Sequence, residues 1–101
     1  MEQIERILHF ESLLDRVAPV LKNLGEALDA FEAVQEDVKE LSAYYESDEW
    51  RDDFETDEAG KLPTDLKRGV LSEDGLYDVL SDHYTLTIRL LDTVSSILKN
   101  R

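Results

Sequence analysis

Apolar residues recur with a seven-residue period over the first 45 positions, and charged residues fill the positions between them. This spacing predicts one long amphipathic helix reaching residue 45, about 65 Å in length. Two rows form its apolar stripe: Ile7, Leu14, Leu21 and Leu28, and Phe10, Val17, Leu24, Phe31, Val38 and Tyr45. A third row lies beside them: Leu13, Val20, Ala27, Val34 and Leu41. The stripe is wider than a two-stranded coiled coil needs and favours a bundle with more than one neighbour, in which Leu24 and Phe31 are buried.

Pro19 falls inside this predicted helix, but the apolar period continues in phase from Val17 to Leu21 and Leu24. We interpret it as a kink, because a proline on the polar face removes only one bond, to the Asp15 carbonyl. A reversal of the chain near Pro19 is the alternative, although no helix-ending Gly or Asn accompanies it.

The long period stops in the segment 46–71. Ser47 is a predicted N-cap of a short helix that Gly60 ends, and Trp50 and Phe54 share one face of it. Residues 65–69 are predicted to form a single helical turn closed by Gly69.

The last helix is predicted to start at Ser72, with Glu73 and Asp74 in its first turn, and to end near Lys99. Its predicted inner face consists of Leu76, Val79, Leu80, His83, Leu86, Leu90, Val94 and Ile97. Such a helix spans about 40 Å and leaves about 25 Å of the first helix uncovered. We therefore expect a homodimer whose interface includes Ile7, Phe10, Leu14 and Val17.

Together these elements predict an all-α fold in a single domain, residues 1–101. Its architecture is an antiparallel helical bundle with a long, Pro-kinked N-terminal helix, a short acidic middle helix and a long C-terminal helix.

Composition narrows the class of protein. Apolar residues make up 42% and charged residues 35%, which predicts a folded chain. The net charge of −13 argues against binding nucleic acid. The acidic start and the lack of a long apolar run predict no membrane segment, and with no Cys a cytoplasmic location is expected.

No catalytic, cofactor or metal motif is found, so we expect a protein that is not an enzyme. His83 lies near Asp78 and Asp82, but the Glu-x-x-His pairs of di-iron bundles are missing, and a hydrogen-bonded histidine is favoured. The acidic run 46–58 lacks the spacing of a calcium loop.

Two clusters allow both a structural and a binding role. Lys61, Lys67 and Arg68 precede the last helix and can bind an anion or neutralise the acidic helix. Tyr44, Tyr45 and Trp50 can bind a partner or seal the end of the bundle.

Long stretches of the middle and last segments resemble a known family. They are Tyr44 to Trp50, Phe54 to Pro63 and Leu66 to Leu80, and the most specific motifs in them are Tyr-Tyr-x-Ser and Arg-Gly-Val-Leu-Ser-Glu-Asp. This pattern is similar to domain of unknown function family 4298, and the resemblance would cover nearly the whole chain. It implies a small bacterial protein with no activity, cofactor or catalytic residue to transfer.

The sequence thus predicts a non-enzymatic helical protein–protein interaction module that associates with itself, and another protein is the second partner expected. The alternative is an acidic inhibitor or antitoxin-like protein that binds a basic surface through residues 46–58.

Overall fold

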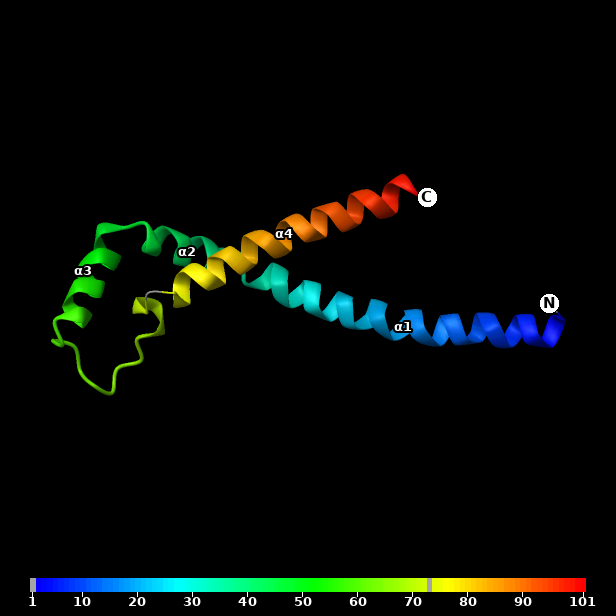
Figure 1. The fold of residues 1–101 in the computed structure, drawn as a ribbon, viewed down its shortest axis with the longest axis horizontal. Helices are drawn as coiled ribbons and strands as arrows, with labels where there is room; N and C mark the ends of the chain where they lie inside the picture. Colours follow the sequence, from blue (N-terminus) through cyan, green and yellow to red (C-terminus); the bar gives the residue numbers. More distant parts are fainter. Residues whose placement is uncertain (1, 73) are drawn as a thin grey trace. The chain divides into compact units, whose positions relative to one another are not determined.

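The computed structural model describes residues 2–72 and 74–101 and is all-α, with no strand in these two ranges (Figure 1). The helices are α1 (Gln3–Ala33), α2 (Gln35–Tyr45), α3 (Asp48–Glu58) and α4 (Gly75–Lys99), with a 3-10 turn, η1 (Gly69–Leu71). The chain divides into two units, residues 1–36 and residues 37–101. The first unit consists of α1 and the start of α2, and the second holds the other elements. The predicted all-α class is confirmed, and the arrangement as an antiparallel bundle stays a prediction.

The first helix contains Pro19 in its interior, as the apolar period predicts. Because α1 is continuous from Gln3 to Ala33, the alternative of a chain reversal near Pro19 is wrong. The proline is tolerated because its ring lies opposite the apolar stripe, where it removes one backbone bond without disturbing the apolar positions. The bend predicted there stays a prediction.

The prediction of one helix to residue 45 is wrong, because α1 ends at Ala33 and α2 begins at Gln35. At Val34 the backbone leaves the helical region (φ −99°, ψ 4°), and its N–H bonds to the Phe31 carbonyl at 3.4 Å, one residue closer than in an α-helix. The Gln35 side chain donates to that same carbonyl at 2.9 Å. The Phe31 carbonyl thus accepts from both Val34 and Gln35 at the point where the helix is interrupted. Hydrophobic periodicity does not detect such an interruption.

Both predicted ends of the middle helix are confirmed. Ser47 caps α3 by accepting from the Trp50 N–H at 3.1 Å, and its hydroxyl donates to the Tyr44 carbonyl at 2.6 Å. At the other end Gly60 adopts φ +70°. The Gly60 N–H bonds to the Asp57 carbonyl at 2.9 Å, and the Lys61 N–H bonds to the Thr56 carbonyl at 3.2 Å. These two bonds form a Schellman motif, which satisfies carbonyls that the helix end leaves free.

The predicted helical turn at residues 65–69 is wrong. A turn closes earlier, where the Leu66 N–H bonds to the Pro63 carbonyl at 3.2 Å. The short helical turn is η1, which Gly69 begins instead of ending. Val70 and Leu71 explain this shift, because placing η1 at 69–71 buries Leu71, which is only 6% exposed.

The last helix begins at Gly75, with its N-cap two residues after the predicted N-cap Ser72, and ends at Lys99 as expected. Ser72 still satisfies a backbone group near its start, accepting from the Gly75 N–H at 3.0 Å while donating to the Gly69 carbonyl at 2.9 Å. The residue at the helix N-cap is Asp74. Glu73, predicted to lie in the first turn, falls outside the described residues.

The core of the second unit is small and lies where η1 packs against α3 and α4. Its buried side chains are Leu71 and Leu76, at 6% and 4% exposure. Leu80, His83 and Leu90 of the predicted inner face of α4 are half-buried. The other members, Val79, Leu86, Val94 and Ile97, are 47–57% exposed. The prediction that Leu24 is buried is also wrong for the single chain, where it is 46% exposed.

Candidate interaction surfaces

The largest exposed apolar feature of the first unit runs along α1, which contains no buried residue among those described. Nine large side chains of this helix are 46–72% exposed. Eight of them lie on one face, which we call the α1 apolar stripe: Ile4, Ile7, Phe10, Leu14, Val17, Val20, Leu21 and Leu24. Leu8 lies outside this face. All four residues of α1 that the sequence predicted for an interface belong to it. A stripe of this length is unusual for a surface that stays in water.

The aromatic cluster of the second unit has a structural role. Trp50 lies between two rings, edge-on to Tyr45 at 4.9 Å and stacked on Phe54 at 5.2 Å between centroids. Its indole N–H donates to the Val70 carbonyl at 2.9 Å, which ties α3 to η1. Of the two roles considered for Tyr45 and Trp50, these contacts support packing within the chain.

Tyr44, the third predicted aromatic, is held by an acidic residue of α3. Its hydroxyl donates to the Asp53 carboxylate at 2.5 Å. Partial burial, this hydrogen bond and the negative charges of Asp53 and Glu49 raise the pKa of Tyr44 to about 12. The hydroxyl therefore stays protonated and works as a hydrogen-bond donor.

The basic residues before α4 differ in what they do. Arg68 forms an ion pair with Asp57 at 2.6 Å, and both side chains are partly buried. This contact supports neutralisation of the acidic helix as the role of Arg68. Lys61 lies beside Asp52 and Glu55 in a shallow hollow on α3, and Lys67 lines a separate groove.

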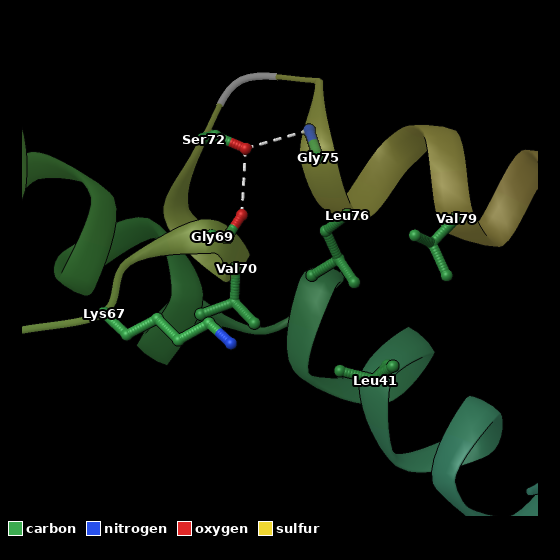
Figure 2. Close-up of a pocket in the computed structure, with 8 residues that line it drawn as sticks. All are labelled: Leu41, Lys67, Gly69, Val70, Ser72, Gly75, Leu76 and Val79. Carbon is green, nitrogen blue, oxygen red and sulfur yellow. Dashed lines mark hydrogen bonds between the residues drawn. The ribbon is translucent and has the colours of Figure 1, made fainter.

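That groove, of about 500 Å³, is formed by residues far apart in the sequence (Figure 2). Its apolar wall combines Leu41 of α2 with Val70, Leu76 and Val79, and Lys67 stands at its edge. Ser72 braces one side through its bonds to Gly69 and Gly75, drawn in Figure 2. Sequence reasoning missed this groove because it depends on how η1 folds against α4. The adjacent apolar pair Val70-Leu71 between Gly69 and Ser72 was the only available signal.

Gly75 is required at the start of α4 for steric reasons. A Cβ on this residue would collide with the Ser72 hydroxyl and lie 2.7 Å from the Gly69 carbonyl oxygen. A side chain here would thus displace the hydroxyl that holds the first N–H of α4.

Residues 2–72 and 74–101 contain no group of three or more His, Cys, Asp or Glu placed to hold a metal ion. Within these same ranges, no helix combines the length and the apolar character that crossing a membrane requires.

These features define an all-α chain with one long exposed apolar helix and a compact, acidic second unit. The profile of a family described as "Domain of unknown function (DUF4298)" matches residues 7–93, and the chain belongs to this family. No curated protein and no solved structure matched the chain.

Proposed function

We propose that the chain is a non-enzymatic interaction module that associates with a second copy of itself through the α1 apolar stripe. The observation that carries this proposal is the exposure of the eight large apolar side chains of this stripe on a helix with no buried residue. Such side chains gain free energy when a partner removes them from water.

The area of the stripe allows a small dimer interface. Fully burying one large apolar side chain removes about 60 to 120 Å² from water at about 25 cal/mol per Å². Eight side chains that are about half exposed thus offer about 240 to 480 Å² on each copy, or about 480 to 960 Å² in the pair. The upper end of this range lies just below the lower bound of about 1,000 Å² for a specific protein–protein interface. Leu13, Leu28 and Phe31, which are half-buried, would add to it.

Light scattering of the purified chain tests the proposal, with two copies as the expected mass at micromolar concentration. The double variant Phe10→Asp/Leu14→Asp should be monomeric, because it places two carboxylates in the apolar interface. Its matched control is Ser12→Asp/Asn23→Asp, which adds the same charge to the opposite face of α1 and should remain a dimer. A monomeric unmodified chain would contradict self-association.

The acidic segment 46–58 favours a second candidate, an inhibitor that binds a basic protein surface. Asp53 and Asp57 are engaged within the chain, by Tyr44 and Arg68, and Asp48 forms an ion pair with Arg51 at 3.6 Å. The other five carboxylates of the segment are exposed: Glu46, Glu49, Asp52, Glu55 and Glu58. Binding to a basic partner that weakens steeply with added salt would support this role, since exposed charges are screened. Either role is compatible with the cytoplasm of a bacterium, where we place the chain.

A further inference from the structure

The positions that flank the α1 apolar stripe differ in size and charge on its two sides. In heptad notation Ile7, Leu14 and Leu21 occupy position a, and Phe10, Val17 and Leu24 occupy position d. One flank, position g, holds Arg6, Leu13, Val20 and Ala27. The other flank, position e, holds Ile4, Glu11, Ala18, Gly25 and Glu32. At the centre of the stripe the g side is thus bulky and the e side is small.

In a parallel, in-register pair of helices, each g residue faces the e residue five positions later on the other copy. Arg6 then faces Glu11, a pair of opposite charge. Leu13 faces Ala18 and Val20 faces Gly25, so that a bulky side chain meets a small one twice. The remaining pair, Ala27 and Glu32, contains no like charges. In this register, therefore, the g residues of one copy face e residues of the other copy that complement them in charge or in size, and no pair brings like charges together.

We propose that α1 pairs with α1 of a second copy as a parallel, in-register two-stranded coiled coil. This inference rests on the proposed self-association and adds its direction, its register and the residues that set them. It also accounts for the width of the stripe, since Leu13 and Val20 are covered by the small e positions of the other copy.

An antiparallel pair matches the flanks less well. With position a facing position d along the whole stripe, the two-fold axis crosses near Pro19. The g positions then face each other, which brings the two Val20 side chains together. On the other flank Glu11 faces Gly25 and Glu32 faces Ile4, and no ion pair forms between the copies. The flanking residues thus favour the parallel pair.

Three features of the single chain agree with a parallel pair. Neither Arg6 nor Glu11 has an ion pair within residues 2–72 and 74–101, and five positions apart on one helix they are not neighbours. Gly25 weakens a helix interior by about 1 kcal/mol. A Cβ at Gly25 would meet nothing within 4 Å in the single chain, so no contact there requires glycine. Pro19 occupies position f, the position farthest from the partner helix.

Disulfide trapping tests the direction, since the natural chain has no Cys. Leu24→Cys should form a covalent dimer within minutes of mild oxidation, because position d faces its own copy in a parallel pair. The matched control Lys22→Cys, on the outer face, should cross-link at least tenfold more slowly. In an antiparallel pair residue 24 faces residue 14. Leu24→Cys alone would then stay unlinked, whereas Leu14→Cys/Leu24→Cys would cross-link.

Charge exchange tests the register without introducing a thiol. Arg6→Glu or Glu11→Arg should weaken dimerisation by about 2- to 30-fold, since each change converts two attractions into repulsions. The double variant Arg6→Glu/Glu11→Arg should recover the original dissociation constant.

The outcomes separate the two proposals. A dimer in which Leu24→Cys cross-links no faster than Lys22→Cys, or in which the double charge variant is not rescued, overturns the parallel register and leaves self-association standing. A chain that scatters light as a monomer overturns self-association itself. A mass of three or more copies overturns the two-stranded pair.

Discussion

The two units of the chain reach helical structure by different means. α1 spans 31 residues, contains no buried residue and has no side-chain cap at its start. The second unit is built from shorter elements that side chains tie together. Ser47 caps α3, Trp50 links α3 to η1, and Ser72 links η1 to α4. Side-chain hydrogen bonds thus hold the elements of the second unit together. An isolated helix such as α1 instead gains most of its stability from packing against another surface.

The largest change in stability is expected for a substitution in the small core of the second unit. Leu76→Ala should lower the free energy of unfolding by about 2 to 5 kcal/mol, because Leu76 is 4% exposed and its truncation leaves a cavity. Denaturant unfolding followed by the fluorescence of Trp50, the single tryptophan, measures this change. The control Leu91→Ala removes the same atoms from a side chain that is 68% exposed and should cost less than about 1 kcal/mol. Equal losses would show that Leu76 does not anchor the second unit.

A change in protein concentration should shift the thermal unfolding transitions of the two units by different amounts. If α1 is stabilised by a second copy, a hundredfold increase in protein concentration stabilises it by about 2.7 kcal/mol. Circular dichroism, to which α1 contributes strongly, should then show a transition that moves to higher temperature. The Trp50 fluorescence transition reports the second unit and should move less. Two transitions that shift together would mean that the units unfold as one.

A smaller effect is expected at the cap of α3. Ser47→Ala should cost about 1 kcal/mol, since it leaves the Trp50 N–H without its acceptor. The control Ser12→Ala lies inside α1, where the hydroxyl only bonds back to the His9 carbonyl, and should change stability by less than about 0.5 kcal/mol. Chemical denaturation of both variants gives the difference. A loss at Ser12 as large as that at Ser47 would argue against the cap.

The smallest expected effect is a dependence on alkaline pH. The pKa of Tyr44 is raised from its ordinary value of 10.0 to about 12 in the folded chain. Its contribution to stability is therefore fully present below pH 10 and is lost as the pH rises through 12, where the folded-state hydroxyl also ionises. In an ultraviolet titration one of the four tyrosines should ionise last, and Tyr44→Phe should remove that step. A late step that persists in Tyr44→Phe would assign it to another tyrosine.

Periodicity predicted well those features that depend on neighbouring residues. The helical character of both long segments, the passage of α1 through Pro19 and the capping by Ser47 and Gly60 all follow from side chains within one or two turns. For the candidate surface, the placement of Ile7, Phe10, Leu14 and Val17 on one exposed stripe was predicted in the same way. The seven-residue spacing defines that face whatever covers it.

Features that depend on a local change of the backbone or on distant contacts were not predictable from the pattern. At Val34 the helix is interrupted although the apolar period continues through this position. The exact position of η1 depends on burying Leu71, and the groove beside Lys67 exists only once Leu41, Val70 and Val79 are brought together. Tyr45 and Trp50 were open to two roles until the stacking with Phe54 and the bond to the Val70 carbonyl assigned them to packing. The sequence by itself therefore determined which residues become helical and which face of each helix is apolar, because both are local properties of the chain. Only the tertiary structure decided the position of η1 and which apolar side chains leave water, because both depend on contacts between residues far apart in the sequence.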